Sequence, residues 1–151
     1  MPEIDPNARL KGTYQKHAEN VDKCVFCDLK DKYVVIRQEG WVLTVNIFPY
    51  INGQVLVLPV RHIENFEELT DDDILTGNHL VKRGMDLLKK EMGIENFWVI
   101  LRQGKIAGKT VRHLHLNIMP YIDGINTWHN QEITVMPQDL ADRLRGRYER
   151  T

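Results

Sequence analysis

The chain has 151 residues, of which 42% are hydrophobic and 27% are charged, and its formal net charge is -1. This near balance of charge excludes a general polyanion-binding surface, although a local basic pocket is compatible with it. No apolar run approaches the roughly 20 residues that span a bilayer. We therefore expect one soluble domain that binds neither membranes nor nucleic-acid polymers.

The first twenty residues are polar and show no sustained periodicity. They lack the basic and apolar regions of a signal peptide, which favours a cytoplasmic location. We expect residues 1–20 to form an N-terminal extension outside the core, with a short helix near Tyr14 to Glu19. The compact domain should cover residues 21–151 and end in a C-terminal tail.

Three short segments rich in β-branched and aromatic residues come next: Tyr33–Arg37, Trp41–Ile47 and Gln54–Leu58. The turn-forming stretches Gln38–Gly40 and Pro49–Gly53 separate them. Strands joined by such short turns predict an antiparallel meander.

A helix start follows at Thr70, which can cap the helix and precedes the three acids Asp71–Asp73. Acidic side chains are favoured in the first turn by the helix dipole. Apolar residues continue at helical spacing as far as Met92, and Gly93 is typical of a C-terminal stop. The pattern predicts one helix of about six turns that crosses the sheet.

The remainder of the chain predicts two more strands, Phe97–Gln103 and Arg112–Met119, around the loop Gly104–Thr110. A last strand is expected at Ile133–Val135, followed by a basic terminal helix over Pro137–Tyr148. The fold class is therefore α+β: an antiparallel sheet of about five strands with a long helix on one face and a C-terminal helix.

The segment His113-Leu-His115-Leu-Asn117 carries the strongest chemical signal. On a strand, side chains two residues apart point to the same face. The two histidines and the asparagine should therefore lie on one side, with the alternating apolar residues in the core on the other. A solvent-facing polar stripe would show the same alternation.

The loop before this segment favours the chemical interpretation. Gly104 and Gly108 permit a close approach of the backbone, and Lys109, Thr110 and Arg112 add donors that suit phosphate. A neutral imidazole beside such an anion-binding loop can attack phosphorus near pH 7. A histidine nucleophile acting on a phosphate is thus a candidate activity.

With these residues the sequence resembles the histidine-triad (HIT) superfamily of nucleotide hydrolases and transferases. The resemblance covers roughly Lys23 to Asp123 and rests on segments that occur in the same order. They are Asn46 with Pro49, Gly53–Pro59, Arg61–Ile63, Glu68–Thr70 and Gln103–Pro120. It implies a HIT-like fold, a homodimer that joins the sheets and long helices of two subunits, and cleavage at the α-phosphate of an adenosine-type nucleotide or dinucleoside polyphosphate.

The resemblance also implies roles for individual residues. His115 occupies the position of the nucleophile, which forms a covalent nucleotidyl-histidine. Asn46 occupies the position that holds the ribose hydroxyls. The implied catalytic residues are His115, His113, Asn117 and Gln103, and the implied nucleotide contacts are Asn46, Gln54, Gly108, Lys109 and Thr110.

Two positions depart from the family pattern: Asn117 replaces the third triad histidine, and Gln54 replaces another histidine. Neither amide titrates near pH 7, so neither can relay a proton. Branches of the family that transfer nucleotidyl groups to phosphate-bearing acceptors place glutamine at the third position. A dinucleoside-polyphosphate phosphorylase and a zinc-braced nucleotide-binding protein with little catalysis therefore stand as alternatives.

The two cysteines form the pair Cys24-x-x-Cys27, and His62 with His113 can complete a Cys₂His₂ tetrahedron. Zinc-containing members of the resembling family use a comparable set. Two reduced cysteines packed as small hydrophobes, or a redox pair, are the alternatives. We expect a structural zinc that leaves His115 available for chemistry.

Overall fold

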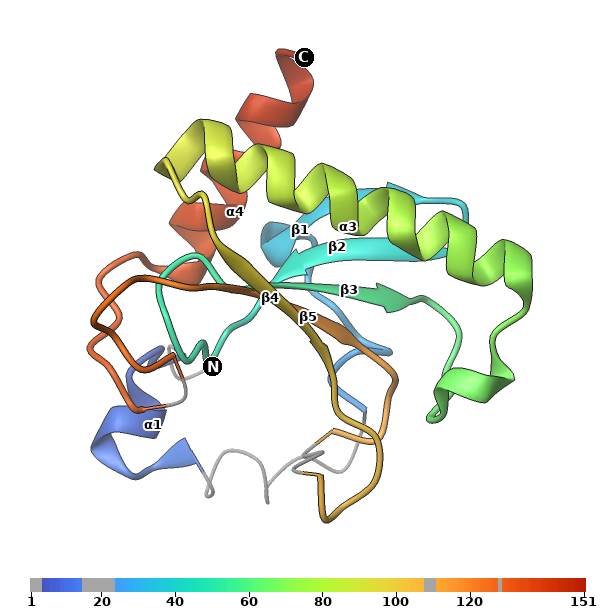
Figure 1. Cartoon of the computed structure of the whole chain (residues 1–151), viewed down its shortest axis with the longest axis horizontal. Coiled ribbons are helices and arrows are strands. Elements are labelled where there is room, and N and C mark those ends of the chain that lie inside the picture. Colours follow the sequence, from blue (N-terminus) through green and yellow to red (C-terminus); the bar gives the residue numbers. More distant parts are fainter. Residues whose placement is uncertain (1–3, 15–23, 108–110, 128) are drawn as a thin grey trace.

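The computed structural model describes residues 4–14, 24–107, 111–127 and 129–151. Its elements are α1 (Ala8–Lys11), η1 (Asp31–Tyr33), β1 (Val34–Gln38), β2 (Trp41–Val45), β3 (Val55–Pro59), η2 (Phe66–Glu68), α3 (Asp71–Met92), β4 (Phe97–Leu101), β5 (Leu116–Pro120) and α4 (Pro137–Glu149). The five strands form one antiparallel sheet in the order β1-β2-β3-β5-β4. Helices α3 and α4 cover one face, and α1 lies on the opposite side (Figure 1). The predicted α+β class is confirmed.

The long helix α3 begins and ends where its sequence predicts. The Thr70 hydroxyl accepts a bond from the Asp73 backbone amide at 3.1 Å, and the Asp73 carboxylate accepts one from the Thr70 amide at 2.9 Å. This capping box satisfies amides that have no partner within the helix. Gly93 ends the helix with a φ of 68°, a conformation that glycine adopts without strain.

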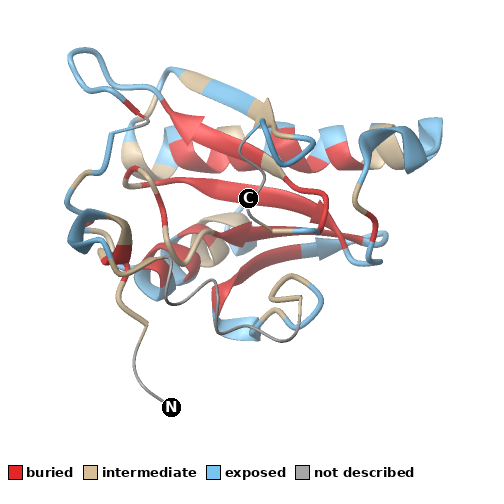
Figure 2. Ribbon diagram, turned by 90° about the horizontal axis from the view of Figure 1, so that it is seen from below, coloured by how far each residue is buried: buried red, intermediate tan, exposed pale blue. Residues whose placement is uncertain are grey.

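The core lies between α3, α4 and the sheet (Figure 2). Gly77 and Gly84 of α3 let the helix approach the strands closely. A methyl group added at Gly77 would lie 2.8 Å from the Trp41 indole, and one at Gly84 would lie 3.0 Å from Ile118. Because the interior is this densely packed, the sheet is rigid and can hold side chains on its other face in fixed positions.

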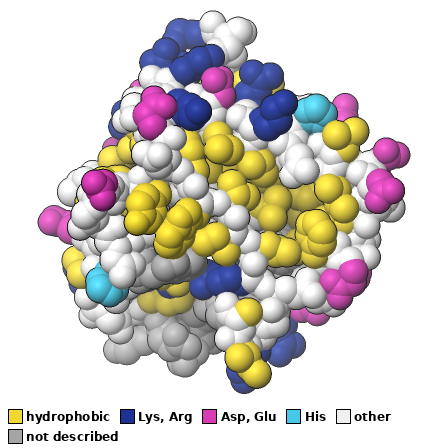
Figure 3. Space-filling model, viewed as in Figure 1, with side chains coloured by type: hydrophobic (Ala, Val, Ile, Leu, Met, Phe, Trp, Pro, Cys, Tyr) yellow, Lys and Arg dark blue, Asp and Glu magenta, His cyan; other side chains and the backbone are white. Residues whose placement is uncertain are grey.

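Strand β4 forms one edge of the sheet and is partly exposed. Trp98 and Val99 on this strand are 38% and 46% exposed, and Tyr121 and Ile122 beyond β5 are similarly open. Hydrophobic side chains gather on this face, over the region of β4 (Figure 3). An apolar edge strand of this kind is a surface on which a partner strand can pair.

The strand that carries the histidines is shorter than predicted. It begins at Leu116, so His113 and His115 lie in the segment before it. The β3–β5 ladder ends at the pair Val57–Leu116, and beyond it the Leu114 amide donates to the Ile63 carbonyl at 2.7 Å. Both imidazoles nevertheless contact the Phe26 ring, so they lie on one side, as predicted.

The predicted strand at Ile133–Val135 is wrong: these residues are not in a strand, and none of the described strands pairs with them. Amide side chains take the place of a strand. Asn7 Oδ1 accepts from the Ile133 amide at 2.6 Å, and Asn52 Oδ1 accepts from the Thr134 and Val135 amides at 3.0 and 3.1 Å. With those amides satisfied, the segment has no need of a ladder. The predicted terminal helix that follows is confirmed as α4.

The N-terminal residues take part in packing, contrary to the expectation that they lie outside the core. Ala8 is fully buried, and Ile4 packs against the core. The helix predicted near Tyr14 to Glu19 lies outside the described residues except for Tyr14 itself. The domain boundary at residue 21 stays a prediction. Within the described part of the chain, no helix combines the length and apolar character needed to cross a bilayer.

Candidate active site and metal centre

A cavity of about 820 Å³ is lined by strand residues that alternate with core residues, so it lies on the face of the sheet opposite the core. Its floor includes a row of paired residues across three strands, Thr44 of β2, Leu56 of β3 and Asn117 of β5. His115 and Phe26 also line it. A cavity of this size accommodates a ligand as large as a nucleotide.

His115 is 8% exposed and lies on the cavity wall. Its Nδ1 is 2.8 Å from the His113 carbonyl oxygen. A carbonyl only accepts hydrogen bonds, so Nδ1 carries the hydrogen and Nε2 carries the lone pair in the neutral ring. The Phe26 ring contacts the imidazole edge to face, with centroids 4.9 Å apart. The imidazole is thereby fixed in the tautomer that a nucleophile at Nε2 requires.

Gln54 and Asn117, the two amides at positions where the resemblance predicts histidines, lie side by side. Gln54 Nε2 donates to Asn117 Oδ1 at 3.1 Å, and Asn117 Nδ2 donates to the Ile100 carbonyl at 3.2 Å. Gln54 Oε1 accepts from the Tyr50 amide at 2.8 Å. Asn117 lines the cavity, whereas Gln54 is fully buried behind it. Gln54 thus orients Asn117 and does not face the cavity itself.

Asn46 follows β2 and also lines the cavity. Its Oδ1 accepts from the Phe48 amide at 2.9 Å, which is a local turn of the kind that asparagine favours. This bond holds the side chain at the wall, in the same cavity as His115. The structure therefore brings together the residues predicted as nucleophile and ribose contact.

Gln103 points elsewhere. Its Oε1 accepts from the Phe66 amide at 2.8 Å, and its Nε2 donates to the Glu67 carboxylate at 3.0 Å. A bond from its own backbone amide, followed by the bond from Gln103, lowers the pKa of Glu67. Gln103 therefore anchors η2 in this structure and does not line the cavity. The predicted phosphate contacts Gly108, Lys109 and Thr110 lie outside the described residues.

The four predicted metal ligands, Cys24, Cys27, His62 and His113, meet beside this cavity, with all their ligand atoms within 4.8 Å of one another. His113 Nδ1 is 3.4 Å from Cys24 Sγ and 3.5 Å from Cys27 Sγ. The His62 Nδ1 atom is 3.3 Å from Cys27 Sγ. This Cys₂His₂ cluster can hold a metal ion.

The spacing of the cluster fits zinc. Tetrahedral zinc with bonds near 2.0–2.3 Å places neighbouring sulfur and nitrogen ligands about 3.5 Å apart, and the three contacts above agree with that separation. His113 Nε2 lies 2.7 Å from the Pro59 carbonyl, so this nitrogen carries the hydrogen and Nδ1 presents its lone pair to the sulfurs. Partial desolvation, then hydrogen bonding and charge from Cys24, raise the pKa of the Cys27 thiol. A metal must therefore displace thiol protons to bind.

Several cavity residues were missed by sequence reasoning. Arg9 and Tyr14 come from the N-terminal segment, and Phe48 and Arg102 also line the cavity. Tyr50 does not line it but contacts Arg9. No motif joins these positions, because residues 9 and 50 meet only in the folded chain. The N-terminal segment therefore belongs to the site.

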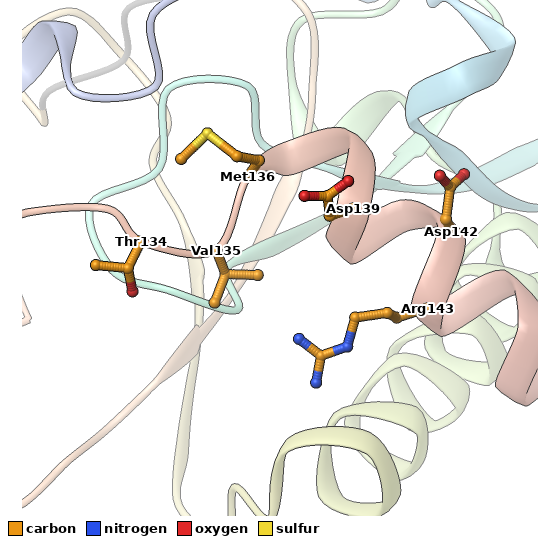
Figure 4. A pocket seen from close by; sticks show the side chains of 6 residues that line it. All are labelled: Thr134, Val135, Met136, Asp139, Asp142 and Arg143. Carbon is orange, nitrogen blue, oxygen red and sulfur yellow. The ribbon is translucent and has the colours of Figure 1, made fainter.

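A second pocket, of about 460 Å³, lies at the start of α4 (Figure 4). Its lining residues are Thr134, Val135, Met136, Asp139, Asp142 and Arg143. The Arg143 guanidinium forms an ion pair with the Glu91 carboxylate at 3.1 Å. None of the predicted site residues lines this pocket within the described ranges, so the larger cavity is the candidate site.

Comparison with known proteins agrees with this geometry. The HIT domain family model matches residues 29–123. An uncharacterised HIT-like protein of Methanocaldococcus jannaschii is 31% identical over 105 residues, which make up 67% of this chain and 81% of that protein. The adenosine 5'-monophosphoramidase of Schizosaccharomyces pombe is 31% identical over 101 residues, or 64% of this chain and 73% of the enzyme. A zinc-bound histidine triad family protein from Mycobacterium smegmatis has a TM-score of 0.71 at 19% identity, over 85% of this chain and 94% of that chain.

Proposed function

This chain belongs to the HIT domain family, and on that basis we propose that it is a nucleotidyl hydrolase or transferase. The substrate is an adenosine-type nucleotide or dinucleoside polyphosphate, cleaved at the α-phosphate. The observation that carries the proposal is His115, whose Nε2 holds the lone pair on the wall of a nucleotide-sized cavity. The 31% identity to an adenosine 5'-monophosphoramidase supports the choice of nucleoside.

In the proposed reaction, His115 Nε2 attacks the α-phosphorus and the leaving group departs with the electron pair of its bond to phosphorus. Water or another acceptor then attacks the same phosphorus and releases His115. The His113 carbonyl stabilises the positive charge that develops on the imidazole, because it accepts the Nδ1 hydrogen. Asn46 holds the ribose, and Asn117, oriented by Gln54, positions phosphate or leaving group.

The remaining phosphate contacts proposed are Gln103, Gly108, Lys109 and Thr110. Gln103 needs to leave its bonds to Phe66 and Glu67 before it can reach a phosphate. Those bonds lie at an exposed position, where a charged ligand competes for an amide more easily than in the core. The proposal therefore includes a reorientation of Gln103 when substrate binds.

We further propose that the Cys₂His₂ cluster holds a structural zinc. The metal supplies rigidity and takes no part in the reaction. It fixes His113, whose carbonyl in turn orients His115. His113 therefore links the metal site to the nucleophile. The zinc-bound protein of the same fold lends support.

The direct test replaces the nucleophile with alanine. We expect His115→Ala to lower turnover of adenosine 5'-phosphoramidate or diadenosine polyphosphates by about 10³-fold or more, while nucleotide binding is largely kept. His79→Ala, at an exposed site of α3, serves as the matched control. Turnover of the His115 variant at the wild-type rate would eliminate the mechanism.

Two alternatives rest on the amides at positions 54 and 117, which cannot relay protons near pH 7. A zinc-braced binding protein would bind these nucleotides and yield no product. A phosphorylase would release a nucleoside diphosphate only when inorganic phosphate is added. The same panel, run with and without phosphate, separates the three activities.

We also propose that the protein is a homodimer built across the β4 edge. The exposed Trp98 and Val99 on that strand offer an apolar surface to a second copy, and the Tyr121 ring lies tilted against Trp98, with centroids 5.1 Å apart. Sedimentation of the wild type and of Val99→Lys tests this, since a charge at the edge should disperse a dimer. The cytoplasmic location stays a prediction that cell fractionation would test.

A further inference from the structure

Arg9 of α1 is held in an unusual setting on the wall of the cavity. Its guanidinium carbon lies 3.8 Å from the centre of the Tyr14 ring and 4.0 Å from that of Tyr50. Its Nε donates to the Phe48 carbonyl at 2.7 Å, and its Nη1 donates to the Tyr50 hydroxyl at 3.0 Å. Two aromatic faces and two neutral acceptors therefore fix the orientation of the guanidinium.

No carboxylate of the described residues forms an ion pair with Arg9. Within the described residues, no Asp or Glu oxygen lies within 4.0 Å of the Arg9 guanidinium. Arg9 is only partly exposed, so water screens it less than a surface arginine. A pre-oriented cation of this kind, on a cavity wall, suits an anionic ligand group that can accept two hydrogen bonds.

The surroundings add to the positive charge. The Arg102 guanidinium carbon lies 5.8 Å from the centre of the Tyr50 ring, and Arg102 lines the same cavity. The charged residues that line it within the described ranges are Arg9, Lys30, Arg102 and Arg112 against Asp28 and Glu64. Lys30 pairs with Asp28 at 2.9 Å, which leaves an excess of arginine. The described lining residues therefore carry a net formal charge of +2, which favours an anionic ligand.

We propose that Arg9, clamped by Tyr14 and Tyr50, binds a phosphate of the substrate beyond the one that His115 attacks. The chain then favours substrates whose leaving group carries phosphate, such as dinucleoside polyphosphates, over those with an uncharged leaving group. When the bond to the α-phosphorus breaks, the electron pair goes to the bridging oxygen, and Arg9 stabilises the charge on the departing phosphate. This assignment rests on the proposed function and names its substrate class.

Arg9 is not needed simply to fasten the N-terminal segment. Ala8 next to it is fully buried, and Asn7 exchanges two hydrogen bonds with Ile133, at 3.2 and 2.6 Å. These contacts dock the segment independently of the Arg9 charge. Removal of the charge can therefore be tested without detaching α1.

The experiment compares Arg9→Gln and Arg9→Lys with the wild type on two substrates, diadenosine triphosphate and adenosine 5'-phosphoramidate. We expect Arg9→Gln to lower kcat/KM for the triphosphate by about 10- to 100-fold, the range for a lost charge-assisted hydrogen bond, and for the phosphoramidate by less than about threefold. Arg9→Lys should restore part of the difference. Arg37→Gln, which removes an exposed arginine paired with Asp31, is the control.

An equal loss of kcat/KM on both substrates, or a loss explained by a lower melting temperature, would overturn the assignment. Arg9 would then only hold the N-terminal segment in place. If the wild type cleaves neither substrate, the proposed function fails, and the role of Arg9 is then decided by binding alone. The probes are AMP and a non-hydrolysable triphosphate analogue of ATP. Arg9→Gln should weaken only the triphosphate analogue by about 10-fold or more; equal weakening of both would refute the proposal.

Discussion

The buried amide pair offers the sharpest test of the structure. In Gln54→Met, a thioether of similar length replaces the amide, and two bonds are lost. Asn117 Oδ1, on a residue only 2% exposed, loses its donor, and the partly buried Tyr50 amide loses its acceptor. An unsatisfied buried polar atom costs about 1–3 kcal/mol and a partly buried one less. We expect the free energy of unfolding to fall by about 2–4 kcal/mol, a large share of a typical total of about 5–15 kcal/mol.

Urea denaturation of the wild type and variants measures this loss. Gln38→Met is the matched control, because Gln38 is exposed on β1 and should change stability by no more than about 0.5 kcal/mol. The double variant Gln54→Met with Asn117→Leu removes both partners, so its cost should be less than the sum of the single costs by about 1 kcal/mol or more. A loss below about 1 kcal/mol in Gln54→Met, or strict additivity, would refute the reasoning.

Two further predictions concern the metal and the packing of the helices. Purified protein should contain about one zinc per chain. Cys27→Ser or a chelator should remove the zinc and lower the melting temperature. Because the pKa of the Cys27 thiol is raised, zinc uptake should also weaken as pH falls. Protein purified without chelator that holds no zinc would count against the site. Arg143, and after it Arg147, lower the pKa of Glu91 by hydrogen bonding, although burial opposes them. A lowered folded-state pKa stabilises the protein above the unfolded-state value and loses that contribution as pH falls through the folded-state value. Glu91→Gln should therefore cost about 1 kcal/mol at pH 7 and less below about pH 4; a cost that is the same at both pH values would contradict this account.

Local patterns in the sequence determined most of the fold. The alternation of residues 33–58 predicted the meander, and Thr70 with Gly93 predicted both ends of α3, because caps and periodicity depend on neighbours along the chain. Motif spacing likewise indicated the Cys₂His₂ set, although its four ligand atoms come together only in the folded chain.

Other features depend on contacts that local patterns do not encode. The Asn7 and Asn52 side chains accept hydrogen bonds from backbone amides of the segment Ile133–Val135, where a strand was predicted. The Gln103 side-chain amide is hydrogen-bonded to η2. Gln54 was expected to touch the nucleotide, yet it lies behind Asn117.

The N-terminal wall of the site shows the difference most clearly. The sequence by itself identified His115 as the nucleophile candidate and placed Asn117 on the same face, because the alternation of one segment sets which side chains share a face. Only the tertiary structure placed Arg9 between Tyr14 and Tyr50 on the same cavity. The residues at 9 and 50 are distant in the chain, and no periodicity or motif connects them. Their contact comes from burying Ala8 and docking α1, which depends on the whole folded surface.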